Sequence, residues 1–393
     1  MNKQKRKQVA IVLDEMSLGG IPKACLPFAN QLANYCDVTM ILYNRQGEMV
    51  QQFVPQIQIE IFENRSVKSI FVQYLKKGQL IKGAKNLTLY LVHAYITKRW
   101  VKSSVLIAQE REWIISKEFD CAIAYHGMSI SQLTRTLYQV KAKKKIAWIH
   151  GEHPFEGIHK KDVEKVYDEF DLIYSDSAAT KEKFLRDFPV LTHKAEVYYN
   201  LLEPEKIRQK ANAPMEIEFD SQMINLVTVG RVSPEKGQDM IPEVMDILIE
   251  KGYKIQWYIV GDGDDKARIE TMVKNKKLSK YISFLGSKTN PYPYMKNCDI
   301  YVQPSYAESY GLTIFEAAII GKAVVATDVG GAKEHLCHGK NSILVESNPR
   351  SIADGIALLL SNNAKKQEIE SNLINSDFSN ESEIQKILSW LEG

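Results

Sequence analysis

The chain has 393 residues, which is enough for two domains that each bury a hydrophobic core. Its net charge of +3, with 45% hydrophobic and 25% charged residues, is typical of a globular α/β protein and argues against a disordered chain. The five cysteines are scattered without C-x-x-C spacing and no apolar run reaches the ~20 residues of a membrane span, which disfavours disulfide scaffolds, zinc clusters and membrane-spanning proteins.

Short apolar runs alternate with helical patterns through the first half, as in a parallel sheet covered by helices. Strands are predicted at 8–14, 37–43, 57–63, 121–126, 145–150 and 172–175. The helix after the first strand is expected to begin near Pro22, just past Gly19 and Gly20, because proline is favoured in the first turn. The first apolar run, 9–13, is too short for a signal peptide, so we expect a cytoplasmic protein.

The segment 64–109 contains nine basic residues and no acidic one, and leucine and aromatic residues are interleaved with the lysines. Helices with basic and apolar faces are typical of proteins that lie on an anionic bilayer. We therefore expect an anionic membrane surface as a partner, with the protein peripheral on the inner face of the cell membrane. The alternative is a pair of surface helices whose apolar side belongs to the core. Nucleic acid is not expected, because no nucleic-acid-binding motif accompanies the charge.

The second half repeats the alternation of strands and helices. Strands are predicted at 224–229, 254–260, 282–285, 299–304, 323–327 and 342–345. Pro204 and Pro214 interrupt the pattern between the two halves, so a domain boundary is expected near 202–216. The sequence thus predicts two doubly wound parallel sheets.

The segment 299–328 is the most informative, because it reads as strand, loop, helix and strand. Gly311 suits a tight turn, and a helix is predicted over 313–320. Open α/β sheets bind ligands at such a loop, and the N–H groups at the helix start suit a phosphate. Glu308 on the loop and Glu316 in the first helical turn would flank that anion and accept hydrogen bonds from hydroxyl groups. The alternative is a buried helix start with two ordinary surface glutamates.

Five motifs follow one another in order along the second half: 229–237, 257–263, 282–286, 304–316 and 330–334. Their order, spacing and residue types resemble the retaining glycosyltransferases of family 4, which use sugar nucleotides and have the GT-B fold. The match is dense over 224–346 and thinner elsewhere. In the first half, 197–200 resembles the family's strand that enters the interdomain linker, so a strand is expected there too. The resemblance implies an α/β protein with two Rossmann-like, doubly wound parallel-sheet domains facing across a cleft.

The resemblance also divides the chain. Residues 1–203 would form the acceptor-side domain, which carries the basic helices of 64–109. Residues 204–375 would bind the sugar nucleotide, and a helix within 376–393 would pack back toward the first domain.

The donor-binding residues that the resemblance implies are Arg231, Lys236, Gly311, Leu312, Thr313, Glu316, Gly19 and Gly20. Arg231 and Lys236 would neutralise the diphosphate, whose negative charge grows as the glycosidic bond breaks. Backbone N–H groups at the start of the helix would hold the phosphates, and the two N-terminal glycines would let their loop approach the diphosphate. Glu316 would accept hydrogen bonds from the ribose.

Three residues are expected near the reacting atoms. Glu308 would accept hydrogen bonds from the transferred sugar. His126 would stabilise positive charge at the anomeric carbon, and His150 would orient donor or acceptor; each histidine could instead be a hydrogen-bonded strand-end residue. No metal and no cofactor is expected, because the Asp-x-Asp pattern at 262–264 overlaps a glycine turn.

We therefore expect a retaining glycosyltransferase that moves a hexosyl group from a nucleotide-diphosphate sugar, UDP-sugar by family frequency. The acceptor would be a saccharide or a lipid-linked acceptor in bacterial surface polysaccharide or glycan synthesis, attacked from the front face. Two alternatives stay open. One is a non-catalytic partner subunit of a transferase pair, and the other is an epimerase or phosphorylase of similar two-domain shape.

Overall fold

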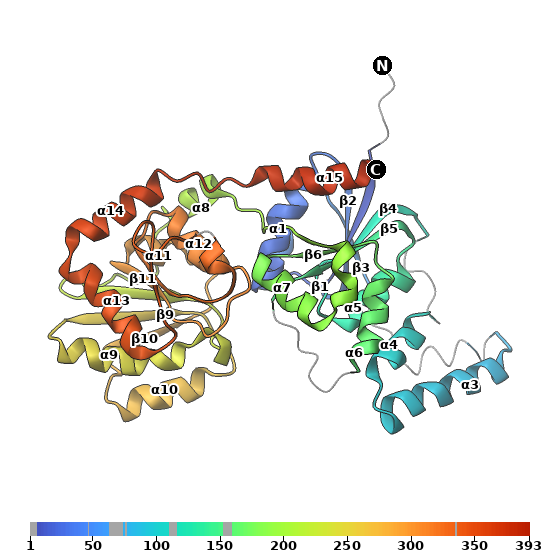
Figure 1. Ribbon diagram of the computed structural model, residues 1–393, viewed down its shortest axis with the longest axis horizontal. Coiled ribbons are helices and arrows are strands. Elements are labelled where there is room, and N and C mark those ends of the chain that lie inside the picture. Colours follow the sequence, from blue (N-terminus) through green and yellow to red (C-terminus); the bar gives the residue numbers. More distant parts are fainter. Residues whose placement is uncertain are drawn as a thin grey trace, which may run out of the picture. The chain divides into compact units, whose positions relative to one another are not determined.

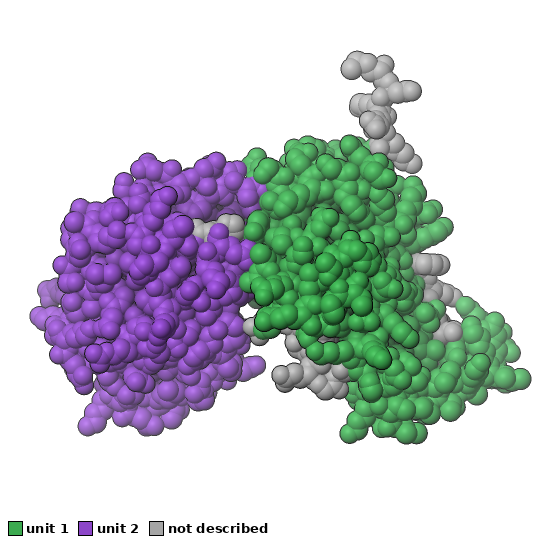
Figure 2. All heavy atoms as spheres, viewed as in Figure 1, with its two compact units in different colours: residues 1–201, 381–393 green, residues 202–380 purple. Residues whose placement is uncertain are grey.

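The computed structural model describes residues 6–45, 47–62, 74, 77–109, 116–151, 159–334 and 336–393 (Figure 1). Its contacts divide the chain into two compact units (Figure 2). Unit 1 comprises Met1–Leu201 and Glu381–Gly393, and unit 2 comprises Leu202–Asn380. Each unit holds one parallel sheet with helices packed against it, so the expected α/β architecture of two Rossmann-like domains is confirmed. No helix among the described residues is both long and apolar enough to span a bilayer.

The sheet of unit 1 has the strand order β3-β2-β1-β4-β5-β6-β7, and neighbouring strands are parallel. Its strands are β1 (Gln8–Glu15), β2 (Asp37–Arg45), β3 (Gln58–Ile61), β4 (Phe119–Ala124), β5 (Ala142–Ile149), β6 (Leu172–Ser175) and β7 (Ala195–Val197). The chain moves outward from β1 to β3 and then returns to add β4 on the other side of β1. The order therefore reverses between β1 and β4, which is where such sheets bind ligands.

The helices of unit 1 are α1 (Gly20–Leu32), η1 (Glu48–Gln52), α3 (Leu80–Leu91), η2 (Val92–Ile96), α4 (Trp100–Gln109), α5 (Ile130–Gln139), α6 (Lys160–Asp168), α7 (Ala178–Asp187), η3 (Pro189–Lys194), η7 (Glu381–Glu383) and α15 (Ile384–Glu392). Serine side chains cap two of the helices. Ser129 Oγ accepts a hydrogen bond from Gln132 N at the start of α5, and Ser177 Oγ accepts one from Thr180 N at the start of α7. Such caps satisfy amides that have no partner inside the helix.

Unit 2 contains a six-stranded sheet with the order β10-β9-β8-β11-β12-β13. Its strands are β8 (Ile224–Val229), β9 (Ile255–Val260), β10 (Ile282–Gly286), β11 (Ile300–Gln303), β12 (Val324–Thr327) and β13 (Ile343–Val345). Its helices are α8 (Pro204–Lys210), η4 (Pro234–Lys236), η5 (Gln238–Met240), α9 (Ile241–Glu250), α10 (Lys266–Asn275), α11 (Tyr292–Asn297), α12 (Leu312–Ile319), η6 (Gly330–Glu334), α13 (Pro349–Ser361) and α14 (Asn363–Ile374). Here the order reverses between β8 and β11.

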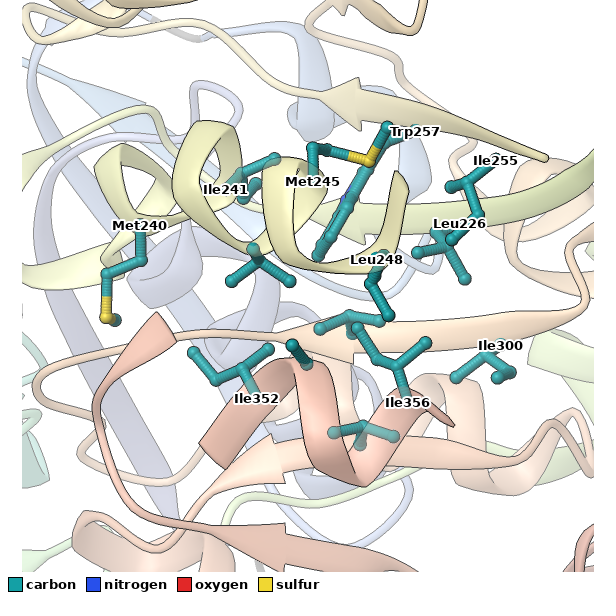
Figure 3. Packing of buried hydrophobic residues seen from close by; sticks show 14 of the residues in the cluster. Leu226, Met240, Ile241, Met245, Leu248, Ile255, Trp257, Ile300, Ile352 and Ile356 are labelled. Carbon is teal, nitrogen blue, oxygen red and sulfur yellow. The ribbon is translucent and has the colours of Figure 1, made fainter. Parts of the chain in front are cut away.

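The core of unit 2 lies between its sheet and the helices α9 and α13 (Figure 3). Met245 and Leu248 of α9 and Ile356 of α13 are fully buried together with Trp257 of β9. The indole Nε1 of Trp257 donates to Thr228 Oγ1 at 3.0 Å, so the largest buried side chain of this core has its polar atom satisfied. This packing fixes the strands whose ends carry the candidate site.

The last helix, α15, belongs to unit 1 although it ends the chain. Ile384, Ile387 and Leu391 are buried. Lys144 Nζ donates to the carbonyl of Trp390 at 2.8 Å, and the amide of Tyr199 donates to a carboxylate oxygen of the neighbouring Glu383 at 3.0 Å. The apolar face of α15 thus completes the core of the unit that begins the chain.

Most predicted strands begin and end within two residues of the observed ones. β5 begins three residues before its predicted start. Two further differences are corrections. The strand predicted at 197–200 lies earlier, at Ala195–Val197, because these residues pair with β6. The strand predicted to end at His126 ends at Ala124, so His126 lies in the following loop. Part of the predicted basic helices, 64–73 and 75–76, lies outside the described residues.

We expect Ile387→Ala to lower the free energy of unfolding by about 2–4 kcal/mol, because the isoleucine is fully buried and the truncation leaves a cavity. Val190→Ala, at an exposed position of the same unit, should change it by less than about 0.5 kcal/mol. Urea denaturation followed by circular dichroism measures both. Equal effects of the two substitutions would show that α15 does not stabilise unit 1.

Candidate functional site

In unit 2 the predicted residues gather on the loops that follow β8 and β11. These are neighbouring strands on either side of the point where the strand order reverses. Because both strands are parallel, their carboxyl ends meet at one edge of the sheet. Arg231 and Lys236 come from the first loop and Glu308 from the second. Residues 72 positions apart along the chain are thereby brought together.

The two loops are joined through their backbones. The carbonyl of Glu235 accepts hydrogen bonds from the amides of Tyr306 at 2.9 Å and Ala307 at 3.1 Å. Gly237 has φ +63°, and a Cβ there would lie 2.0 Å from the carbonyl oxygen of Pro304. Only glycine therefore allows the first loop to approach the second so closely.

Lys236 and Glu308 form an ion pair across these loops. Lys236 Nζ lies 2.8 Å from Glu308 Oε2. The other carboxylate oxygen, Oε1, accepts hydrogen bonds from Ser305 Oγ at 2.7 Å and Gln303 Nε2 at 3.3 Å. The Glu308 side chain is only 4% exposed, so these three donors compensate the cost of burying its charge. Glu308 is therefore held rigidly, and one side of Lys236 faces solvent.

Arg231 is placed differently, because its side chain is 72% exposed and pairs with Glu235 at 2.8 Å. Partial burial raises the pKa of Glu235, but the hydrogen bond from Ser233 and the charge of Arg231 outweigh it. The pKa of Glu235 therefore lies below its ordinary value, and the carboxylate stays ionised at neutral pH. The exposed guanidinium can rotate toward an anion, whereas Lys236 is already fixed at the loop junction.

The helix α12 begins at Leu312, one residue before the predicted start, and Gly311 precedes it with φ +84°. The N–H groups of Leu312 and Thr313 open the helix and so have no acceptor within it, as at any helix start. Together with the helix dipole they favour an anion at this end. The predicted phosphate-binding amides thus lie on the loop that also carries Glu308.

Glu316 does not lie where the sequence predicted. It is the fifth residue of α12 rather than part of its first turn, and it is 3% exposed. Its Oε1 accepts a hydrogen bond from Tyr292 Oη at 3.1 Å. Burial, with the neighbouring charge of Glu316, raises the pKa of Tyr292, so the hydroxyl stays protonated and donates. Sequence reasoning missed Tyr292, since no motif marks it.

A third loop packs against the backbone of the segment that carries Glu308. It follows β12 and contains Gly330, whose φ is +56°. A Cβ at Gly330 would lie 1.5 Å from the carbonyl oxygen of Glu308, and the amide of Gly331 donates to the carbonyl of Ser309 at 2.9 Å. The backbone on which Glu308 stands is therefore packed directly against this glycine.

Three of the four predicted residues of unit 1, Gly19, Gly20 and His126, lie at the point where its strand order reverses. Gly19 is the N-cap of α1 and Gly20 its first residue, in the segment that follows β1. His126 lies in the loop after β4, where its backbone amide donates to Gln132 Oε1 at 3.2 Å. Burial, and to a lesser degree the nearby His150, lowers the pKa of His126, so its ring is neutral at pH 7. A neutral imidazole can donate one hydrogen bond and accept another.

His150 follows β5 directly and is buried within an aromatic cluster. Its ring stacks on Trp148 with centroids 5.9 Å apart and lies 4.7 Å from the ring of Tyr125. Nδ1 is 3.7 Å from Asp176 Oδ2, and Nε2 has no hydrogen-bond partner among the described residues. Tyr125 Oη and Trp148 Nε1 are unpartnered in the same sense. The histidine thus has one ring nitrogen near a carboxylate and the other buried without a hydrogen-bond partner among the described residues.

Among the described residues no group of three or more His, Cys, Asp or Glu is arranged to hold a metal ion. Within the Asp-x-Asp pattern at 262–264, the side chain of Asp262 makes contacts with residues close to it in the sequence. Asp262 Oδ1 accepts a hydrogen bond from the amide of Gly263 at 2.8 Å, and Oδ2 pairs with Lys266 at 3.4 Å. Arg231, Lys236 and the start of α12 contribute positive charge at the site of unit 2.

Residues 210–375 match the family described as Glycosyl transferases group 1. One curated relative is the poly(ribitol-phosphate) alpha-N-acetylglucosaminyltransferase of Staphylococcus aureus, 30% identical over 42% of this chain and 34% of its own. Another is the N-acetylgalactosamine-N,N'-diacetylbacillosaminyl-diphospho-undecaprenol 4-alpha-N-acetylgalactosaminyltransferase of Campylobacter jejuni, 27% identical over 52% and 54%. The chain thus spans between a third and three fifths of the length of such relatives.

Solved structures resemble the chain over nearly its whole length. HepE of Anabaena, crystallised with UDP-glucose, has a TM-score of 0.71 at 18% identity and covers 98% of this chain and 99% of its own. At this identity the likeness establishes the fold, which is GT-B.

Gly330→Ala should destabilise unit 2 far more than Gly339→Ala. Both glycines have positive φ, but a Cβ at Gly339 meets no atom within 4 Å. Gly339→Ala should therefore cost only the backbone strain of about 1–2 kcal/mol, and Gly330→Ala at least twice as much. Thermal and urea unfolding of the two variants measure the difference. Similar losses would show that the loop after β12 is not packed against Glu308.

Proposed function

Because residues 210–375 match the family described as Glycosyl transferases group 1, we propose that the chain is a retaining glycosyltransferase of family 4. It transfers a hexosyl group from a UDP-sugar to a saccharide or lipid-linked acceptor of a bacterial surface polysaccharide or glycan. One observation carries the proposal: Lys236 and Glu308 meet beside the start of α12, at the reversal point of the sheet. That arrangement combines a cation, free amides and a carboxylate, which a diphosphate attached to a sugar requires.

The relatives support the donor and the stereochemistry. The Anabaena structure contains UDP-glucose, and the names of both curated relatives specify an α-linked product. An α-linked UDP-sugar that yields an α-linked product retains the configuration at its anomeric carbon. The undecaprenol diphosphate in the name of the Campylobacter relative supports a lipid-linked acceptor.

The diphosphate would bind at the amides of Gly311, Leu312 and Thr313, with Lys236 beside it and Arg231 folding over it. As the bond between sugar and phosphate breaks, negative charge grows on the leaving oxygen. Cations and a helix start that are already in place stabilise this charge without reorganising, which is where electrostatic catalysis is strongest. These groups supply the positive charge in the proposal, so no metal and no cofactor takes part.

Glu308 would hold the transferred sugar. Oε1 already accepts two hydrogen bonds and Oε2 one, so an acceptor position on Oε2 is left for a sugar hydroxyl. Lys236 has three N–H donors and could contact Glu308 and a phosphate together. The pair would thus couple recognition of the sugar to neutralisation of the leaving group. Glu316, oriented by Tyr292, would accept from the ribose hydroxyls.

Unit 1 would supply the remaining groups. Gly19 and Gly20 leave space for the diphosphate, since a Cβ at Gly20 would meet no atom within 4 Å. The neutral His126 would donate a hydrogen bond to the sugar without competing with Lys236 for the phosphates. His150, whose Nε2 is buried without a hydrogen-bond partner among the described residues, would orient donor or acceptor. The acceptor hydroxyl would attack from the front face and pass its proton to the departing phosphate oxygen.

The purified protein should release UDP from one UDP-sugar in a panel of UDP-, GDP- and dTDP-sugars, and a bacterial lipid extract should increase the release. Chromatography of the released nucleotides measures it. Release from a GDP- or dTDP-sugar would overturn the donor assignment. A folded protein that releases nothing from any donor, with or without extract, would favour a non-catalytic partner subunit.

Lys236→Met should lower kcat/KM on the order of 10²–10³-fold and destabilise unit 2 by about 1–3 kcal/mol, because Glu308 loses its buried cation. The double variant Lys236→Met/Glu308→Gln removes both charges, so it should recover much of the stability and none of the activity. Enzyme assays and urea unfolding report the two effects separately.

Lys251→Met is the matched control, because Lys251 pairs with Asp354 on the surface of the same unit. It should change neither activity nor stability measurably. Activity close to wild type in the double variant would contradict the assigned roles of Lys236 and Glu308, whatever its stability.

A further inference from the structure

Residues 77–109 of unit 1 form a helical arm that consists of α3, η2 and α4. α3 contacts η2 and α4, and α4 contacts α5 and α6 of the unit's main body. In Figure 1, α4 lies between α3 and α6, so α3 is the outer helix of the arm. The arm is therefore a feature added to the side of the sheet-and-helix layers.

The inner helix of the arm is fixed to the body of unit 1. Val101 and Ala108 of α4 are buried. Arg99 makes a two-pronged contact with the buried Asp162 of α6, with Arg99 Nε donating to Asp162 Oδ2 at 2.7 Å and Nη2 donating to Oδ1. Burial raises the pKa of Asp162, but the hydrogen bonds and charge of Arg99 outweigh it and keep the pKa below its ordinary value. Arg99 thus anchors the arm.

The outer part of the arm exposes a large apolar surface. Eight of the fifteen large apolar side chains that are exposed among the described residues lie between 80 and 100. Ile81 is 88% exposed and Ile96 is 75% exposed, and the ring of Tyr95 lies against that of Trp100 with centroids 6.2 Å apart. Exposed apolar side chains are ordinary when single, but a cluster of this kind marks an interaction site.

The same arm carries basic side chains. Residues 77–109 include no acidic side chain, and Lys85 and Lys98 are exposed. Lys98 stands at φ +51°, in the turn between η2 and α4, next to the exposed Ile96. Exposed apolar and basic side chains therefore occur together on the arm.

We propose that the arm docks on an anionic phospholipid bilayer, with Ile81, Ile96 and Trp100 entering the interface and Lys85 and Lys98 contacting lipid phosphates. A bilayer matches both properties of the surface, because it offers apolar depth under a negative plane. A two-fold contact with a second copy would place this basic surface against itself and repel. The inference rests on the arm alone and holds whether or not the proposed transferase activity does.

Wild-type protein should float with vesicles that contain phosphatidylglycerol and not with phosphatidylcholine vesicles, and salt should weaken the binding. Lys85→Gln/Lys98→Gln should lower the partition coefficient about thirtyfold at low salt, because each basic residue near such a surface contributes about 1 kcal/mol to binding. Ile81→Gln/Ile96→Gln should also lower the partition coefficient. The binding that remains should come from the basic residues and should be lost at high salt.

The control for charge is Lys274→Gln/Lys277→Gln, because it removes two exposed lysines, one on a helix and one at φ +58°, as on the arm. The control for apolar exposure is Val190→Gln/Ile374→Gln, at 60% and 64% exposure. Both should bind as the wild type does. The substituted side chains are all exposed, and circular dichroism and thermal melting verify that each variant folds.

Three results would overturn the proposal. The first is vesicle binding unchanged in both arm variants, and the second is equal binding to neutral vesicles. The third is a wild type that ignores vesicles but self-associates in light scattering, with Ile81→Gln/Ile96→Gln becoming monomeric. That third result would assign the arm to a second copy of the chain.

Discussion

The Lys236–Glu308 pair is the constraint around which the site of unit 2 is built. A carboxylate that is almost fully buried must be compensated, and here the compensation comes from another loop. The lysine can reach Glu308 only because Gly237 lets its loop lie against Pro304, and the carboxylate stays in place because Gly330 packs beneath its carbonyl. The order of the strands and the two glycines together allow the contact between Lys236 and Glu308. Whatever binds here meets a cation whose position is already determined.

Sequence patterns predicted the scaffold well because its strands are buried on both faces. β6 and β8 begin and end at the predicted residues, because both are short, mostly apolar runs whose residues are nearly all buried. β7 lies earlier in the chain than predicted, because it is only three residues long, includes the charged Glu196 and is defined by its pairing with β6. Gly311 was identified correctly as the turn before α12, because a positive φ there demands glycine.

The interactions between side chains could not be predicted in the same way. The sequence marked Lys236 and Glu308 separately, but their contact joins residues that only the sheet order brings together. The sequence predicts Glu316 in the first helical turn, but α12 begins one residue earlier than predicted, so Glu316 is its fifth residue and accepts a hydrogen bond from Tyr292. Arg99 is one of the nine basic residues that the sequence predicts on a membrane-facing surface, but in the structure it pairs with Asp162 of α6. The sequence shows which side chains are charged, but only the tertiary structure shows which partner each of them contacts.

The packing of α15 on unit 1 has a consequence for how the protein is made. Ile384, Ile387 and Leu391 complete the core of the unit whose first strand is Gln8–Glu15. On a ribosome, unit 2 is therefore synthesised in full while unit 1 still lacks part of its core. The order in which the units finish folding is the reverse of the order in which they begin, because domains fold as their residues emerge. Until its last helix arrives, the first unit exposes the apolar surface that α15 later covers, which makes the nascent chain a client for chaperones.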